Sequence, residues 1–131
     1  MADQQQALQA FLVESDENIT HLEQELIELE QRPEDAEALG RAFRAIHTIK
    51  GTSAFFGLNR LEQLTHKAED LLGQLRSGTA KLTLERVGVL LETVDAVRSL
   101  LAEIRSTGED SVTTQDELVT RLEAALETEH E

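Results

Sequence analysis

The feature that most constrains the fold is a stripe of apolar residues that recurs every three or four positions near the start of the chain. The stripe has one polar member and consists of Leu8, Leu12, Ser15, Ile19, Leu22, Leu26 and Leu29. Residues three and four apart lie on the same side of an α-helix. The spacing therefore predicts a long amphipathic helix from about residue 5 to residue 31.

A second helix is expected to begin at Pro33, because proline is well tolerated at the first helical position. Glu34 and Asp35 would then lie in its first turn, where the helix dipole favours negative charge. Gly57 is expected to end this helix. Its buried face should consist of Leu39, Ala42, Ile46, Ile49 and Ser53, with Phe43 and Phe56 alongside.

Three more amphipathic segments follow, each preceded by a residue that suits the N-cap position. The expected N-caps are Asn59, Thr83 and Thr114, with Glu62 and Glu117 completing capping boxes at the first and last of them. The third helix should stop at Ser77-Gly78 and the fourth near Thr107-Gly108. Four amphipathic helices with short loops predict an all-α protein, an antiparallel up-down four-helix bundle with an additional short C-terminal helix.

Composition excludes several classes of function. The chain carries 12 Lys and Arg against 26 Asp and Glu, a formal charge of −14, which disfavours binding to nucleic acid or to an acidic membrane surface. It has no Cys, and hence no disulfide, thiolate chemistry or Cys-based zinc site. No apolar run approaches the roughly 20 residues that span a bilayer, and the N-terminus does not resemble a signal peptide. We therefore expect a soluble cytoplasmic protein.

The most unusual segment of the second helix is His47-Thr48-Ile49-Lys50-Gly51. His47 lies off the apolar stripe, so its ring should face solvent or a boundary, with Lys50 and Gly51 as its neighbours on the helix surface. Gly40, seven residues earlier, should lie on nearly the same face. A glycine inside a helix costs roughly 0.5–1 kcal/mol relative to Ala, so two glycines beside one histidine indicate a surface that a partner approaches closely. A solvated histidine with incidental glycines is an equally good interpretation.

The third helix carries a second group of chemically capable residues. His66 and Glu69 share a face with Glu62 and Gly73, and this face should lie at the height of His47 if the two helices are antiparallel neighbours. A carboxylate there could accept a hydrogen bond from one imidazole nitrogen of His47 and leave the other as a free nucleophile. The alternative is an ordinary solvated helix face.

Other chemistries fit the residues poorly. Lys50-Gly51-Thr52 reverses the order of a phosphate-binding loop. The single His66-x-x-Glu69 has the wrong order for a di-iron bundle, and no nucleophile elbow supports a Ser-His-Asp triad. We interpret His21 as a boundary residue rather than a ligand, and His130 as part of the tail. No metal site is expected.

The segment Phe43–Gly57, with His47-x-x-Lys50-Gly51 at its centre, resembles the signature of histidine phosphotransfer domains. It is most similar to the N-terminal phosphotransfer domain of CheA-type chemotaxis kinases. That subfamily also carries His and Glu in the segment that matches Leu64–Leu72, and it has a fifth helix after the bundle. The resemblance covers essentially the whole chain.

This resemblance implies that a separate ATP-binding kinase domain phosphorylates His47. A CheY-like receiver domain of a response regulator would then take the phosphoryl group onto its own Asp. The chain would be a phosphotransferase fragment of a histidine kinase, without autokinase activity alone. It would bind no cofactor, since the kinase domain supplies ATP and the receiver holds Mg²⁺.

The site residues receive the following expected roles. His47 would attack through Nε2, while Glu69 accepts from Nδ1–H and holds the tautomer. Lys50 would offset the charge of the phosphoryl oxygens, and His66 would orient Glu69 or complete the hydrogen-bond network. The expected partner contacts are Arg44, Thr48 and Gly51, the last of which leaves room for incoming loops.

We expect residues 1–108 to form the bundle, and residues 109–131 to form the fifth helix and the start of a linker to kinase domains that this chain lacks. The fragment should be monomeric, because another domain usually carries dimerisation in such kinases. Two alternative functions are a free-standing phosphorelay protein and a non-catalytic helical adaptor in which His47 accepts nothing. The position of His47 near the start of the chain and the His66/Glu69 pair favour the kinase.

Overall fold

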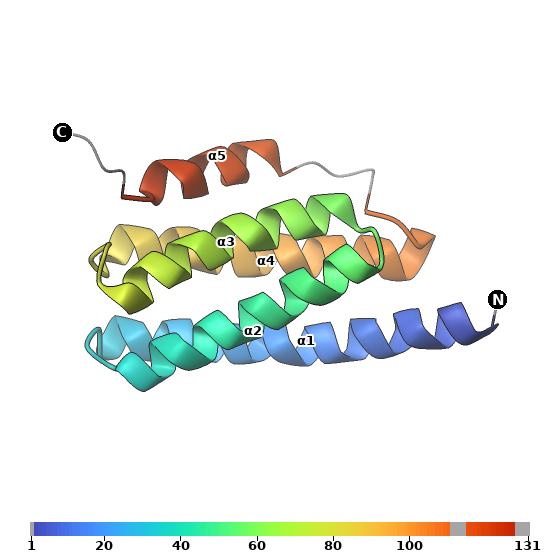
Figure 1. Cartoon of the computed structure of the whole chain (residues 1–131), viewed down its shortest axis with the longest axis horizontal. Coiled ribbons are helices and arrows are strands. Elements are labelled where there is room, and N and C mark those ends of the chain that lie inside the picture. Colours follow the sequence, from blue (N-terminus) through green and yellow to red (C-terminus); the bar gives the residue numbers. More distant parts are fainter. Residues whose placement is uncertain (1, 111–114, 128–131) are drawn as a thin grey trace.

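A computed structural model describes residues 2–110 and 115–127, and this part of the chain consists of five α-helices without a strand. The helices are α1 (Ala2–Gln31), α2 (Ala36–Phe55), α3 (Asn59–Ser77), α4 (Leu84–Thr107) and α5 (Asp116–Ala125). The α1–α2 and α3–α4 connections lie at one end of the bundle and the α2–α3 turn lies at the other (Figure 1). The all-α, up-down four-helix bundle with an additional C-terminal helix is confirmed.

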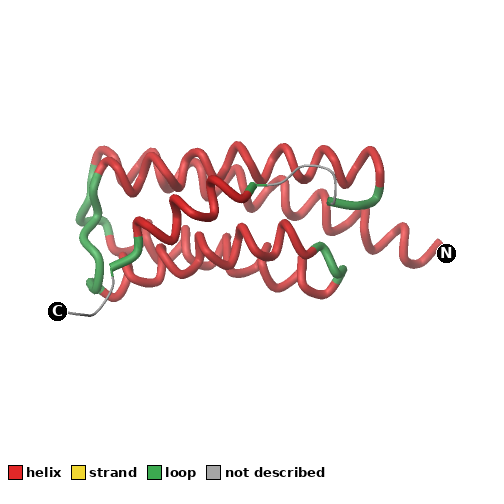
Figure 2. Tube along the Cα trace, turned by 90° about the horizontal axis from the view of Figure 1, so that it is seen from above, coloured by secondary structure: helices red, strands yellow, loops and turns green. Residues whose placement is uncertain are grey.

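The four long helices enclose one aliphatic core. Helix α1 packs against α2 and α4, and α3 packs against α2 and α4, so that each of the four has two neighbours among the other three. Figure 2 shows the bundle from above, with the turns that join the four long helices at its two ends. The stripe predicted for α1 is buried from Leu12 to Leu29, and Leu8 at its start is half-buried. Burying one such Leu side chain stabilises the fold by about 1.5–3 kcal/mol.

The polar members of the buried faces are satisfied within their own helices. Ser53 of α2, predicted to face the core, is fully buried and donates from Oγ to the carbonyl oxygen of Ile49 at 2.6 Å. Thr65 of α3 is also fully buried and donates to the carbonyl oxygen of Leu61 at 2.8 Å. Such bonds remove the cost of burying a hydroxyl without a partner.

The predicted start of α2 at Pro33 is wrong. The helix begins at Ala36, and Asp35 is the N-cap, with its Oδ1 accepting from the backbone N–H of Ala38 at 3.1 Å. A carboxylate at the N-cap satisfies one of the free N–H groups of the first turn, which proline cannot do. Pro33 lies instead in the turn between α1 and α2. The helix ends at Phe55, and Gly57 follows it with φ +70°.

The predicted capping box of α3 is also wrong. Asn59 is the first helical residue, and Leu58 occupies the N-cap position without a side-chain hydrogen bond. The backbone N–H of Leu61 instead donates to Oδ2 of Asp110 at 2.7 Å. Asp110 is buried and follows α4, 49 residues away in the sequence. The start of α3 is therefore capped by a distant carboxylate that no local pattern reveals.

The remaining helix ends largely agree with the sequence. Gly78 and Gly108 end α3 and α4 with φ +84°, a backbone conformation that favours glycine. Thr83 caps α4, with its Oγ1 accepting from the N–H of Arg86 at 3.1 Å. Thr114 lies outside the described residues, and Gln115 holds the N-cap position of α5 without a side-chain bond.

Helix α5 packs on α3 and α4 and buries Leu118, Val119 and Leu122. Two side chains hold the end of this helix. Nε of Arg86 donates to the carbonyl oxygen of Ala125 at 2.8 Å, and Nε2 of Gln74 donates to that of Glu127 at 3.0 Å. No helix among the described residues has the length and apolar character needed to cross a membrane.

Candidate functional site

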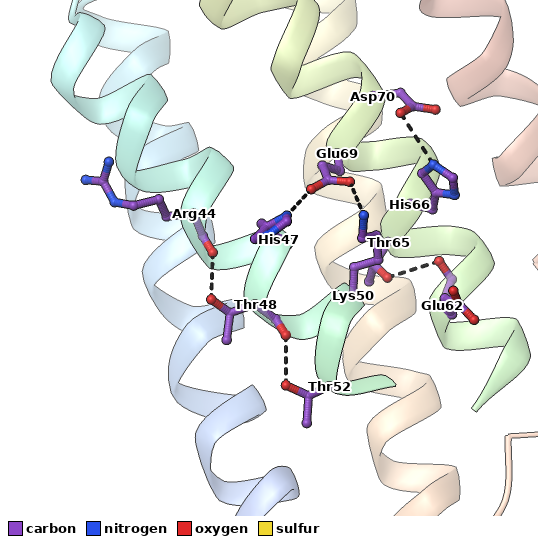
Figure 3. Close-up of polar contacts among 10 residues, drawn as sticks. All are labelled: Arg44, His47, Thr48, Lys50, Thr52, Glu62, Thr65, His66, Glu69 and Asp70. Atoms are coloured by element: carbon purple, nitrogen blue, oxygen red, sulfur yellow. Dashed lines mark hydrogen bonds and ion pairs between the residues drawn. The ribbon is translucent and has the colours of Figure 1, made fainter. Parts of the chain in front are cut away.

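The site is built around His47, which α2 presents at its boundary with α3. The side chain is 60% exposed, and its Nδ1 is hydrogen-bonded to Oε2 of Glu69 on α3. Figure 3 shows the imidazole pointing across the helix boundary toward this carboxylate. An ionised carboxylate only accepts hydrogen bonds, so Nδ1 carries the proton. In the neutral ring, Nε2 then holds a free lone pair.

Glu69 is held by two donors from one helix. Its side chain is only 10% exposed, and its Oε1 accepts from Nζ of Lys50 at 2.7 Å. Burial raises the pKa of Glu69, but the hydrogen bonds from Lys50 and His47 outweigh burial and lower the pKa below its usual value. The carboxylate is therefore ionised at neutral pH, in the form that fixes the tautomer of His47.

Helix geometry explains why two side chains of α2 reach one acid. His47 and Lys50 are three residues apart, so they are neighbours on the side of α2 that faces α3. Glu69 lies on α3, which runs back along α2 after the turn at Gly57. The antiparallel pairing thus brings together the residues that the sequence placed at similar height.

His66 lies close to this network but makes a different contact. Its side chain is 54% exposed, and its Nε2 lies 3.7 Å from Oδ1 of Asp70, one turn further along α3 (Figure 3). The oxygens of Glu69 contact His47 and Lys50 instead. The position next to Glu69 that was expected for His66 is therefore filled by Lys50, because Glu69 points inward to α2 and the ring of His66 faces solvent.

The donor set near Glu69 bears on cation binding. His66, Glu69 and Asp70 each offer one ligand atom, and these atoms lie within 4.8 Å of one another. One of these residues, Glu69, already accepts from the ammonium group of Lys50 at 2.7 Å. The positive charge of this ammonium group disfavours a divalent metal ion at the same carboxylate, so we assign no metal to these three residues.

The glycines near His47 have different surroundings. Gly51 is exposed, and a Cβ built on it would meet nothing within 4 Å, so it leaves open space beside His47. Gly40 is buried, and a Cβ there would lie 3.5 Å from Nη1 of Arg44. Gly40 was expected on nearly the same face as His47, as part of a surface that a partner approaches closely, but its burial next to the side chain of Arg44 leaves it no such access.

The remaining expected partner contacts lie on the solvent side of α2. Arg44 and Thr48 are both exposed, and Oγ1 of Thr48 donates to the carbonyl oxygen of Arg44 at 2.9 Å (Figure 3). Together with Gly51, they form an exposed surface next to the imidazole of His47. On α1, His21 is exposed, away from the contacts of His47 with α3.

Sequence reasoning missed two residues that touch the site. The ring of Phe43 stacks on the imidazole of His47, with the centroids 5.9 Å apart and the planes inclined by 11°. The guanidinium carbon of Arg76 on α3 lies 4.1 Å from the centroid of the Phe43 ring. The four-residue spacing of Phe43 and His47 on one helix was the available signal for the first contact.

An exposed imidazole that a buried acid holds in one tautomer, on the second helix of a four-helix bundle, is the arrangement of a histidine phosphotransfer domain. Residues 6–107 match the family described as "Hpt domain", and the chain belongs to this family.

Within the family, this chain is a CheA-type domain. It is 45% identical over 111 residues to the sensor histidine kinase CheAY of Helicobacter pylori, and the match covers 85% of this chain. The match covers only 14% of that relative. It is also 37% identical over 102 residues to the chemotaxis protein CheA of Halobacterium salinarum, covering 78% of this chain and 15% of the relative.

Two solved structures share the fold. The solution structure of the histidine phosphotransfer domain of CheA superposes with a TM-score of 0.86 at 29% identity, over 96% of each chain. The phosphorylated P1 domain of CheA3 from R. sphaeroides, solved in complex with CheY6, gives a TM-score of 0.83 at 30% identity. That match covers 89% of this chain and 92% of the other.

Proposed function

We propose that this chain is the phosphotransfer domain of a CheA-type histidine kinase in chemotaxis signalling. A separate kinase domain phosphorylates His47 from ATP, and His47 passes the phosphoryl group to an Asp of a response-regulator receiver. The observation that carries this proposal is the hydrogen bond from Nδ1 of His47 to the buried Glu69, which leaves Nε2 unprotonated on an exposed ring.

The first step is an attack on ATP. The lone pair of Nε2 forms a bond to the γ-phosphorus, the bond from that phosphorus to the β,γ-bridging oxygen breaks, and ADP leaves with the electron pair. Positive charge develops on the imidazole as Nε2 gives up its lone pair. Glu69 offsets this charge through Nδ1–H, and Lys50 lies where its ammonium group can face the phosphoryl oxygens.

The second step returns the ring to its starting state. A carboxylate oxygen of the receiver Asp attacks the phosphorus, the N–P bond breaks, and its electron pair goes back to Nε2. The open space at Gly51 and the exposed side chains of Arg44 and Thr48 suit them as contacts for the incoming domain. Support for a receiver as the partner comes from the similar P1 domain, which was solved in complex with CheY6.

The reactants other than the histidine belong to the partner domains. We assign ATP to the kinase domain and Mg²⁺ to the receiver, and we expect no autokinase activity from this chain alone. The much greater length of the curated relatives favours a kinase over a free-standing phosphorelay protein. In this proposal residues 109–131 lead toward the kinase domains. His66 supports the site through its contact with Asp70. The protein works in the cytoplasm, as a monomeric phosphotransfer unit.

A phosphorylation assay tests the proposal. The chain is mixed with a CheA kinase core and labelled ATP, and we expect a phosphoryl group that is stable in base and lost in acid. The His47→Gln variant should take up no label, while His21→Gln, the same change at an exposed histidine of α1, should be labelled like the wild type. Full labelling of His47→Gln would refute the assignment.

The second step is tested on domain that has been labelled and freed of ATP. Adding a receiver domain with Mg²⁺ should move the label from His47 to the receiver, and chelating the Mg²⁺ should stop this transfer. Retention of the label on His47 in the presence of several CheY-like receivers and Mg²⁺ would leave the chain without the proposed acceptor and would contradict the second half of the proposal.

A further inference from the structure

The imidazole of His47 has a neighbour on its face as well as at its edge. Phe43 lies one turn earlier on α2, and its ring is stacked on the imidazole at 5.9 Å with an inclination of 11°. Aromatic rings at such separations attract each other when they stack with an offset. We propose that Phe43 is a positioning residue that fixes the plane of the imidazole and so aims Nε2 at the incoming phosphorus. This inference rests on the proposed function.

The need for such a residue follows from the exposure of His47. The side chain is 60% exposed, and its hydrogen bond to Glu69 restrains the ring at a single atom. Rotation about that contact would carry Nε2 out of line with the phosphorus. Phosphoryl transfer depends chiefly on positioning and charge stabilisation, so a nucleophilic nitrogen without a fixed orientation reacts more slowly. A flat ring beside the imidazole blocks this rotation on one side.

Phe43 is itself held by α3. A Cβ on Gly73 would lie 3.5 Å from Cε1 of Phe43, which is van der Waals contact, so the ring lies directly against α3 at this position. The guanidinium carbon of Arg76 lies 4.1 Å from the ring centroid, which is a cation–π contact. The ring also packs against the core.

Helix α3 therefore restrains the imidazole in two ways. Glu69 holds its edge directly, and Gly73 and Arg76 hold its face through Phe43. The two restraints act in different directions, since a hydrogen bond lies in the plane of the ring and a stacked neighbour lies above it. Together they fix the orientation of Nε2 before any partner arrives.

The first test replaces the flat ring by an apolar side chain of similar size. In Phe43→Leu we expect kcat for phosphorylation by the kinase core to fall about fivefold with KM unchanged. Phe43→Tyr, which keeps the ring, should restore kcat. The matched control is Phe56→Leu, because Phe56 is also half-buried and packs on Phe11, with ring centroids 5.2 Å apart, rather than on His47. Its kcat should stay at the wild-type value.

A spectroscopic measurement separates positioning from general packing. Carbon relaxation at Cε1 of His47 reports the amplitude of ring motion in solution. We expect the order parameter of this ring to drop in Phe43→Leu and to stay unchanged in Phe56→Leu. Arg76→Gln changes an exposed residue and spares the core. It should lower both the order parameter and kcat, each by less than Phe43→Leu does.

The outcomes are distinguishable from a failure of the proposed function. If the wild type is not labelled on His47, the proposed function is wrong. If the wild type is labelled but both Phe43→Leu and Arg76→Gln keep the wild-type kcat and ring order, only the positioning role is wrong. Should Phe43→Leu fail to fold, Arg76→Gln decides alone, and wild-type values in that variant overturn the inference.

Discussion

Replacing Glu69 by Gln removes the charge of the site with little change in shape. The carboxylate accepts from Nδ1 of His47 and from Nζ of Lys50 through its two oxygens. An amide has one acceptor oxygen and an NH₂ group that only donates, so it cannot satisfy both partners. The variant therefore loses at least one charge-assisted hydrogen bond, together with the negative charge that offsets the developing charge on the imidazole.

The size of the effect follows from the exposure of the site. A hydrogen bond to a charged group contributes about 1.5–3 kcal/mol. The lower end applies here because solvent screens an imidazole that is 60% exposed. A loss of about 1.5 kcal/mol in the transition state slows phosphorylation by about tenfold. Since the side chain of Glu69 is only 10% exposed and offers little surface to a partner, kcat should fall while KM stays nearly constant.

The assay is the initial rate of phosphorylation of Glu69→Gln by a kinase core at several concentrations of the domain. Circular dichroism and urea unfolding establish that the variant is folded. Glu62→Gln is the matched control, since it removes a carboxylate from the same helix two turns away. An unchanged kcat in a folded Glu69→Gln variant would remove Glu69 from the mechanism. An equal loss in Glu62→Gln would mean that the general charge of α3, rather than the contact to His47, sets the rate.

Three further predictions follow from single contacts. Lys50→Met should slow phosphorylation several-fold and raise the pKa of Glu69, because the hydrogen bond from Lys50 lowers that pKa. An NMR titration of the Glu69 carboxyl carbon measures the change in pKa, and an unchanged pKa would contradict the ion pair. Asp110→Ala should lower the free energy of unfolding by about 1–2 kcal/mol in urea, because the N–H of Leu61 loses its cap, whereas Asp95→Ala at an exposed position should change it little. The pKa of Glu69 is lower in the folded chain than its usual 4.5, so its ionised form stabilises the fold above that value and the stabilisation is lost as the pH falls through the folded pKa. The difference in unfolding free energy between wild type and Glu69→Gln should therefore shrink when the pH is lowered from 7 to about 3, and a constant difference would show that the charge of Glu69 does not stabilise the fold.

The sequence alone predicted the helices and their buried faces well. The stripe from Leu12 to Leu29 is buried as expected, and Gly78 and Gly108 end their helices in the left-handed conformation. These features depend on residues close together in the chain, for which the period of 3.6 residues and the preferences of capping residues are sufficient. The error at the start of α2 is of the same local kind, since Asp35, which was expected in the first turn, is the N-cap and Pro33 lies in the turn before it.

The errors elsewhere come from contacts between distant residues. Asp110, at the end of α4, caps the start of α3 from 49 residues away. His66 was expected to orient Glu69 or to complete the hydrogen-bond network; the sequence did not reveal that Lys50 donates to Glu69 and that His66 lies next to Asp70. Height along a helix pair can be estimated by counting residues from the turn, which is why His47 and Glu69 were brought together correctly. The rotation of each helix about its own axis, which decides the side chains that face the neighbouring helix, cannot be obtained from such a count.

The sequence by itself determined that His47 lies off the apolar stripe of a helix, with Lys50 and Gly51 as neighbours, because helical periodicity fixes which residues of one helix share a face. Only the tertiary structure decided which groups of α3 meet that face. The rotation of two packed helices depends on how their buried side chains interlock across the core, and that rotation turned Glu69 toward His47 and Lys50 and left His66 facing solvent.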